Sequence, residues 1–204
     1  MISHLLDNNP LWQFSLAEKA AVLHLLSCMP QRRTAIEIGS YKGGFLRVLA
    51  HQFHWVFSLD IDHSHLPERP NVRFVAGDSK QTLPQLNHLP DVDLILIDGD
   101  HAFETVLADI NNALTFTPTA TQAILIHDSW YTPTREAINQ ANWAENPYVY
   151  YVEKDFVPGD MVGSPDGNLF VGGLALALLS PLPRAGELVI RQSQDYMYRM
   201  CLGK

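Results

Sequence analysis

Five short apolar runs, separated by segments of helical periodicity, most constrain how this 204-residue chain can fold. Each run has the length and composition of a buried strand, and each contains or ends in a polar residue. Strands that alternate with helices form a parallel sheet with helices on both faces. The sequence therefore predicts a doubly wound, mostly parallel α/β sheet, with strands at residues 35–38, 55–60, 72–78, 92–98 and 123–128.

The polar residues of these runs are expected to meet in one crevice. All carboxyl ends of a parallel sheet lie at one edge, and open α/β sheets bind their ligands there. Residues that are distant in the sequence should therefore converge. They are Glu37 within the first run, then Asp60, Asp78, Asp98 and the pair His127 and Asp128.

A glycine-rich turn, with Gly39, Gly43 and Gly44, follows the first run and precedes a helical segment. This order places backbone N–H groups and the positive end of a helix at the ligand-binding edge. A dinucleotide site would have the pattern G-x-G-x-x-G, but Tyr41 stands at the second glycine position. The turn alone could be a tight connection without a ligand, and its spacing disfavours NAD.

The rest of the chain is predicted to form a single domain over residues 1–204. Residues 1–30 form a helical cover, in which Ser15 and Glu18 make a capping-box pattern. Residues 31–130 are the ligand-binding core. Residues 131–204 should supply a helix, an antiparallel strand pair (148–153 and 169–179) and a closing helix (185–202). Trp130, Tyr131, the 132–145 helix and the glycine-rich segment 157–168, read as a lid or a plain connection, are candidates for substrate recognition.

Composition excludes several classes of partner. The formal net charge of −8 comes without any lysine and arginine cluster, so we expect no nucleic-acid partner. The longest apolar run, Leu169–Leu179, is too short to span a bilayer, so we expect no membrane insertion. The two cysteines, Cys28 and Cys201, have no metal-type or disulfide spacing, and a cytoplasmic location is expected. Homo-oligomerisation is left open.

The ordered set of motifs resembles a class I S-adenosylmethionine-dependent methyltransferase, most closely the methyltransferase family 24 branch that is related to catechol- and sugar-O-methyltransferases. The resemblance covers about residues 30–180. It rests on Glu37-x-Gly39 with Gly43, Asp60, Gly77-Asp78-Ser79, Asp98-Gly-Asp-His101 and His127-Asp128-Ser129. It implies a seven-stranded Rossmann-like sheet with an antiparallel last strand, and S-adenosyl-L-methionine as cofactor.

The resemblance also implies roles for individual residues. Asp60 would accept hydrogen bonds from the cofactor ribose, with Asp62 as the alternative. Asp78 and Ser79 would receive the adenine, although both are also good helix caps. The turn would hold the amino-acid end of the cofactor, with Glu37 ordering the loop or accepting from the cofactor ammonium group. The cofactor-binding residues are thus Glu37, Gly39, Ser40, Tyr41, Gly43, Asp60, Asp78, Ser79 and Asp98.

An oxygen acceptor must lose its proton before or during methyl transfer, and two versions of this step fit. In the first, Asp98, His127 and Asp128 bind a divalent cation (Mg, Mn, Fe or Zn); a histidine departs from the all-oxygen set of the catechol-type enzymes and suits Zn²⁺, Fe²⁺ or Mn²⁺ better. In the second, His101 or His127 acts directly as base. The catalytic candidates are Asp98, His101 and His127, and in a third reading His127 and Asp128 only end a strand.

The sequence therefore predicts an enzyme that transfers a methyl group from S-adenosylmethionine to a small-molecule acceptor, which we expect to be methylated on oxygen. Two alternatives remain. One is a catalytically silent nucleotide-binding or assembly module of the same fold. The other, less favoured by the glycine spacing, is an NAD(P)-dependent oxidoreductase.

Overall fold

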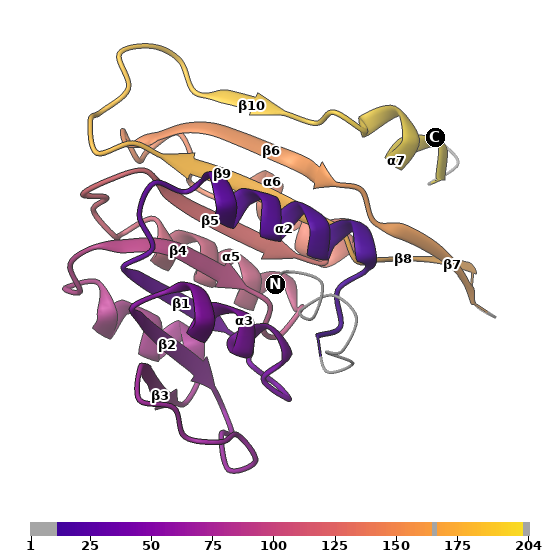
Figure 1. The fold of residues 1–204 in the computed structure, drawn as a ribbon. Coiled ribbons are helices and arrows are strands. Elements are labelled where there is room, and N and C mark those ends of the chain that lie inside the picture. Colours follow the sequence, from indigo (N-terminus) through magenta and orange to yellow (C-terminus); the bar gives the residue numbers. More distant parts are fainter. Residues whose placement is uncertain (1–11, 165–166, 202–204) are drawn as a thin grey trace.

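The computed structural model describes residues 12–164 and 167–201. Its centre is an eight-stranded sheet in the order β10-β6-β9-β5-β4-β1-β2-β3 (Figure 1). Strands β3, β2, β1, β4 and β5 run parallel, and β9 runs antiparallel to both β5 and β6. The strands are β1 (Thr34–Ile38), β2 (Trp55–Asp60), β3 (Val72–Ala76), β4 (Val92–Ile97), β5 (Gln122–His127), β6 (Val149–Val157), β9 (Leu174–Leu179) and β10 (Val189–Arg191).

The predicted doubly wound, mostly parallel sheet with an antiparallel last strand is confirmed. Helices cover both of its faces, and the central strand β4 is buried along its whole length. Leu94 and Leu96 pack toward α2 and α3, whereas Ile95 and Ile97 pack toward α5 and α6. Central parallel strands are apolar on both faces for this reason. The helices are α2 (Leu16–Cys28), α3 (Gly44–Gln52), α4 (Ser79–Thr82), α5 (Phe103–Ala113), α6 (Thr132–Gln140) and α7 (Asp195–Cys201), with a 3₁₀ turn η1 at Leu83–Leu86.

The C-terminal part differs from the sequence prediction in two places. The expected strand at residues 169–179 is divided at Gly172 and Gly173, whose φ angles of 69° and 83° interrupt it. Its first half is β8 (Gly167–Val171), which pairs with β7 (Asp160–Ser164) in a separate hairpin. The segment 157–168, read as a lid or a connection, is therefore mostly this hairpin, which projects from the sheet (Figure 1).

The closing helix predicted at residues 185–202 is wrong in its first half. Val189 and Ile190 belong to β10, an eighth strand that adds to the predicted seven at the edge of the sheet. β-Branched residues of this kind fit a strand better than a helix. The helix α7 begins only at Asp195 and packs through Tyr198 against Trp130 and Phe170.

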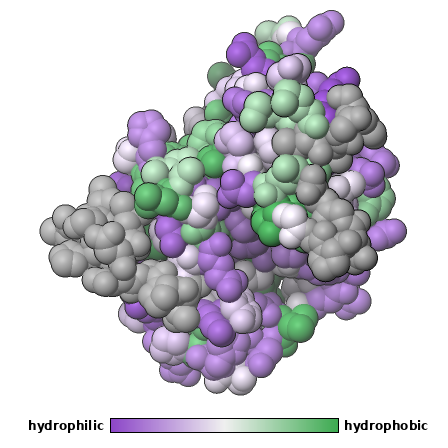
Figure 2. Space-filling view, turned by 90° about the vertical axis from the view of Figure 1, so that its right-hand side faces the viewer, coloured by the Kyte–Doolittle hydropathy of each residue, from purple (hydrophilic) through white to green (hydrophobic). Residues whose placement is uncertain are grey.

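The cofactor-binding edge predicted from the strand order faces the viewer in Figure 2. Hydrophilic side chains surround a hollow in the middle of this face, and the hydrophobic ones occur in separate groups. No helix in the described part of the chain has the length and apolar character needed to cross a membrane.

Candidate active site

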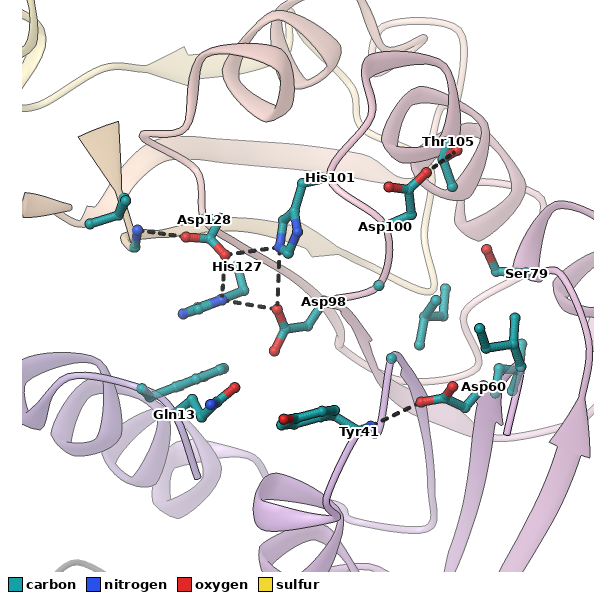
Figure 3. A pocket seen from close by; sticks show the side chains of 18 of the residues that line it. Gln13, Tyr41, Asp60, Ser79, Asp98, Asp100, His101, Thr105, His127 and Asp128 are labelled. Atoms are coloured by element: carbon teal, nitrogen blue, oxygen red, sulfur yellow. Dashed lines mark hydrogen bonds and ion pairs between the residues drawn. The ribbon is translucent and has the colours of Figure 1, made fainter. Parts of the chain in front are cut away.

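A cavity of about 1210 Å³ opens at the carboxyl ends of the parallel strands (Figure 3). It is lined by strand ends, by the start of α2 and by the base of the β7–β8 hairpin. Nine of the sequence-predicted site residues lie on its wall, and they come from five different connections of the sheet. They are Gly39, Tyr41, Asp60, Asp78, Ser79, Asp98, His101, His127 and Asp128.

Three predicted cofactor residues do not line this cavity: Glu37, Ser40 and Gly43. Only some of the candidates for substrate recognition lie on the cavity wall. Pro158 and Asp160 reach the cavity wall, whereas Trp130 is buried in the cluster under α7. The N-terminal wall, formed by residues 13–15 and Glu18, was not predicted from the sequence.

The glycines of the first turn are required by the protein itself. Gly39 has a φ of 83°, and a Cβ there would lie 2.1 Å from the carbonyl oxygen of Asp98. Gly43, at φ 72°, precedes the first residue of α3, and a Cβ there would lie 2.8 Å from a methyl group of Leu66. The resemblance implied that Gly39 and Gly43 are cofactor-binding residues. In the structure, contacts within the chain already demand them.

Glu37 lies behind the turn in a buried chain of hydrogen bonds. Ser40 Oγ donates to Glu37 at 2.7 Å and lies 2.5 Å from Ser58 Oγ, which is 3.1 Å from His63 Nε2. Burial raises the pKa of Glu37 to about 8; the Ser40 hydrogen bond opposes this, and the charges of Asp98 and Asp60 add to it. These contacts favour the loop-ordering role of Glu37 over direct contact with a ligand.

The raised pKa of Glu37 predicts a pH-dependent stability. Between pH 4.5 and about 8 the folded protein holds a proton on Glu37 that the unfolded chain releases. The contribution of this proton to the free energy of unfolding is therefore complete below pH 4.5. It is lost as the pH rises toward 8, by up to about 1.4 kcal/mol per pH unit. We expect Glu37→Gln, which stays neutral, to lose less stability than the wild type between pH 5 and pH 8.

Urea unfolding of both proteins at pH 5, 6.5 and 8, without ligand, measures this difference. Parallel curves of unfolding free energy against pH for the two proteins would contradict the prediction. Glutamine can still accept from Ser40 Oγ, so the comparison isolates the charge.

Asp60 joins the end of β2 to the glycine turn. Its Oδ2 accepts from the backbone N–H of Tyr41 at 2.9 Å, and its Oδ1 accepts from the N–H of Asp62 at 3.3 Å (Figure 3). Its neighbour Asp62 is highly exposed and accepts from Ser64 N–H at 2.8 Å. Asp60 is therefore fixed by the fold with its carboxylate on the cavity wall.

Asp78 makes the helix-cap contact that the sequence left open, whereas Ser79 bonds to a side chain of α5 instead. Asp78 is the N-cap of α4, and its Oδ1 accepts from Lys80 N–H at 2.9 Å. Ser79 Oγ donates to Asp109 at 3.0 Å. Burial, against the Ser79 hydrogen bond, raises the pKa of Asp109 to about 6. Asp78 and Ser79 also line the cavity, so these contacts within the chain are compatible with ligand contact.

Two aspartates and two histidines form a compact cluster on the opposite wall (Figure 3). His127 Nδ1 lies 2.9 Å from Asp98 Oδ1 and 3.2 Å from Asp128 Oδ2. His101 Nε2 lies 2.9 Å from the same Asp128 oxygen and 3.8 Å from Asp98 Oδ1. Asp128 adopts a left-handed backbone, with φ 51°, and its other oxygen accepts from Gly172 N–H at 2.6 Å. His127 and Asp128 thus do more than end a strand.

The carboxylates of this cluster raise the pKa of both imidazoles, and the imidazoles lower the pKa of Asp128. The contacts with Asp128 and then Asp98 raise the pKa of His101 to about 9 against the effect of burial. Burial acts to lower the pKa of His127, but Asp98, Asp128 and Glu18 together raise it well above 6.5. Burial acts to raise the pKa of Asp128, and the two histidines outweigh it, so the net pKa lies below the ordinary range. The contacts within the cluster therefore favour the protonated form of both imidazoles when only protein atoms surround them.

The donor set of this cluster fits a divalent metal ion. One ligand atom from each of the four residues lies within 4.8 Å of the others. Ligands placed about 2.1 Å from one ion in a tetrahedral arrangement are about 3.4 Å apart, close to the distances found here. His101 Nε2 is buried and makes no aligned hydrogen bond within the described chain despite its short distance to Asp128. Two imidazoles with two carboxylates suit Zn²⁺, Fe²⁺ or Mn²⁺ better than Mg²⁺.

Glu18 is one of the cavity residues that the sequence prediction missed. The residue is only 2% exposed, and its Oε1 lies 3.4 Å from His127 Nε2. In the sequence, Glu18 matched a capping box, and that prediction is confirmed, with Ser15 Oγ accepting from Glu18 N–H. The capping box fully explained a glutamate at position 18. No local pattern in the sequence therefore indicated that its side chain would reach the cavity.

Comparisons with known proteins agree with the fold. Residues 36–129 match a family model described as a methyltransferase domain. No curated protein sequence matches the chain. Many solved structures do match, and all three described next share the fold at sequence identities below 20%.

One similar structure is a protein from Klebsiella pneumoniae that is provisionally named an O-methyltransferase. It is 18% identical with a TM-score of 0.60, over 88% of this chain and 89% of that one. The MycE methyltransferase of the mycinamycin pathway, solved with Mg, S-adenosylhomocysteine and mycinamycin VI, is 17% identical with a TM-score of 0.59, over 91% of this chain and 56% of that one. The N-methyltransferase NodS from Bradyrhizobium japonicum, solved with S-adenosylhomocysteine, is 14% identical with a TM-score of 0.52, over 87% and 94%.

Proposed function

We propose that this chain, a class I methyltransferase by the family model that it matches and by its fold, transfers a methyl group from S-adenosylmethionine to an oxygen of a small molecule with the help of a divalent cation. The observation that carries the proposal is the convergence of Asp98, His101, His127 and Asp128. They lie on the wall of the same cavity as the residues suited to the cofactor.

The cofactor would lie along the wall formed by the glycine turn and the ends of β2 and β3. Asp60 would accept from the ribose hydroxyls, because its carboxylate is held on that wall by Tyr41 N–H. Asp78 and Ser79 would border the adenine. Gly39 and Tyr41 would bound the amino-acid end of the cofactor, with Glu37 and Ser40 supporting the turn from behind. The S-adenosylhomocysteine bound by MycE and NodS supports this choice of ligand.

Methyl transfer is an in-line displacement, in which an acceptor lone pair forms the new bond to carbon as the carbon–sulfur bond breaks. The sulfur keeps that electron pair, and the cofactor leaves as S-adenosylhomocysteine. A divalent cation held by the cluster would lower the pKa of an acceptor hydroxyl, so that its proton is released to water, and would fix the position of its oxygen. Asp98 and Asp128 supply the negative charge for such an ion, and the stacked ring of Phe14 shields His127 from water. The protein thus contributes orientation and a dry site.

The direct-base version is less favoured by the same contacts. A general base and a metal ligand both need a free imidazole lone pair, but a cation bound at the cluster would displace the proton that the contacts hold on His101 up to a pKa of about 9, whereas a direct base has no such competitor. A catalytically silent module is also less favoured, because holding a buried His127 and two partly buried aspartates as charged groups costs stability and serves no evident packing purpose.

The charge of the cavity supports a neutral or cationic acceptor. Lys80 is the one lysine or arginine among the described residues of its wall, and Asp78 pairs with it at 3.5 Å. An anionic group such as a phosphate or a CoA tail would meet carboxylates instead. The acidic residues of the wall are Glu18, Asp60, Asp62, Asp78, Asp98, Asp100, Asp128 and Asp160.

A methyl-transfer assay with isotope-labelled S-adenosylmethionine tests the proposal on a panel of neutral and cationic alcohols, phenols and sugars. We expect turnover that EDTA abolishes and that Mn²⁺, Zn²⁺ or Fe²⁺ restores, with the label on oxygen in the product by NMR. Turnover that persists in EDTA in protein free of bound metal would favour the direct histidine base. Label on nitrogen would show that the acceptor atom is nitrogen and would overturn the proposed oxygen acceptor.

A further inference from the structure

We infer that Glu18 is a positioning residue: it holds the ring of His127 so that Nδ1 faces Asp98 and Asp128. The inference rests on the metal site proposed above and extends it to the N-terminal helix. The two ring nitrogens of His127 have different surroundings. Nδ1 lies within 3.2 Å of the two aspartates, and Nε2 lies 3.4 Å from Glu18 Oε1 without an aligned hydrogen bond.

Two hydrogen bonds fix the carboxylate of Glu18. Oε2 accepts from Ser15 N–H at 2.5 Å, which closes the capping box of α2. Oε1, the oxygen nearer to His127, accepts from Gly173 N–H at 2.6 Å. A capping glutamate normally stays at the surface, because the cap needs only the backbone N–H of one residue. Here the residue is 2% exposed, so capping alone does not account for its place.

The glycine pair between β8 and β9 ties Glu18 to the cluster. Gly172 N–H donates to Asp128, and the next N–H, that of Gly173, donates to Glu18. Both glycines have positive φ angles, 69° and 83°, which lets successive N–H groups serve two carboxylates on different sides of His127. A Cβ at Gly172 would also lie 3.2 Å from Glu18 Oε1.

Phe14 completes the enclosure of the imidazole. Its ring stacks on that of His127, with centroids 4.2 Å apart and an angle of 3° between the planes. Stacking limits how far the imidazole can tilt. The carboxylate beside Nε2 then determines which ring nitrogen faces the aspartates. Histidines that bind metals generally direct their second nitrogen to a carboxylate or a carbonyl, which fixes the orientation and raises ligand basicity. Glu18 occupies that position for His127.

Calorimetric titration of the metal-stripped protein with Mn²⁺ tests the inference in wild type, Glu18→Gln and Ser15→Ala. We expect Glu18→Gln to weaken Mn²⁺ binding about 10-fold or more. Ser15→Ala removes the serine half of the capping box but leaves the contacts of Glu18 with His127 and Gly173, so Mn²⁺ affinity should stay within about 2-fold. Titration with S-adenosylhomocysteine on the same samples should give equal affinities for all three proteins.

Mn²⁺ affinity of Glu18→Gln within about 2-fold of wild type, or an equal loss in Ser15→Ala, would overturn the positioning role. If Glu18→Gln does not fold, Glu18→Asp takes its place, because the shorter side chain keeps the charge and withdraws it from His127. Absence of Mn²⁺ binding by the wild type would overturn the inference as well. Binding of S-adenosylhomocysteine in that case would leave the methyltransferase proposal standing on its own test.

Discussion

Replacement of Asp128 by asparagine is expected to reduce kcat/KM for methyl transfer by about 10³-fold, or about 4 kcal/mol of transition-state stabilisation. The Asp128 carboxylate contacts both imidazoles of the cluster, so its charge is required by any cation bound there. Asparagine tolerates the left-handed backbone of this position and can still accept from Gly172 N–H. The measurement is steady-state turnover at saturating Mn²⁺, together with calorimetric affinity for S-adenosylhomocysteine.

Asp100→Asn is the matched control for this variant. Asp100 lies in the same cavity and accepts from Thr105 Oγ1 at 2.9 Å, but it belongs to no contact of the cluster. Its kcat/KM should stay within about 3-fold of the wild type. Retention of more than about a tenth of wild-type kcat/KM by Asp128→Asn would refute a catalytic role for this carboxylate. A parallel fall in S-adenosylhomocysteine affinity would assign the residue to cofactor binding instead.

Replacement of Asp60 by alanine is expected to weaken S-adenosylhomocysteine binding by about 10²-fold. Two ribose hydroxyls that donate to one carboxylate contribute about 3 kcal/mol in total. Part of the loss comes from the turn, because Tyr41 N–H also loses its acceptor. Calorimetric titration measures the affinity, and Asp60→Asn, which keeps an acceptor for Tyr41, should show an intermediate loss of about 10-fold.

Asp62→Ala separates the two aspartates of this loop. Asp62 is exposed and accepts from Ser64 N–H, so its removal should change the affinity by less than about 2-fold. A large loss in Asp62→Ala, with near-normal binding by Asp60→Ala, would transfer the ribose contact to Asp62. Equal small effects in both variants would remove the ribose contact from this loop.

Most of the sheet could be predicted because buried parallel strands must be apolar on both faces. The run at residues 92–98 illustrates this: β4 occupies Val92–Ile97, and all six residues are buried. The capping box was equally reliable, since it depends on residues within one turn. Ser15 and Glu18 make both reciprocal contacts in the structure.

The predictions failed where one local pattern fits two structures. Leu169–Leu179 reads as a single strand, yet it divides at Gly172 and Gly173 because their N–H groups serve Asp128 and Glu18. Those partners are 44 and 155 residues away in the sequence. No local pattern records contacts at such separations.

The shared edge of Asp60, Asp98, His127 and Asp128 followed from the strand pattern alone, because a parallel sheet places the carboxyl ends of its strands together whatever the side chains do. Which residues face the cavity and which support it could be seen only in the folded chain. The side chain of Glu37 points inward to Ser40. Glu18, in helix α2, lies beside Nε2 of His127, away from the aspartates at Nδ1. The physical reason is that side-chain direction depends on long-range packing, whereas convergence at the sheet edge depends only on topology.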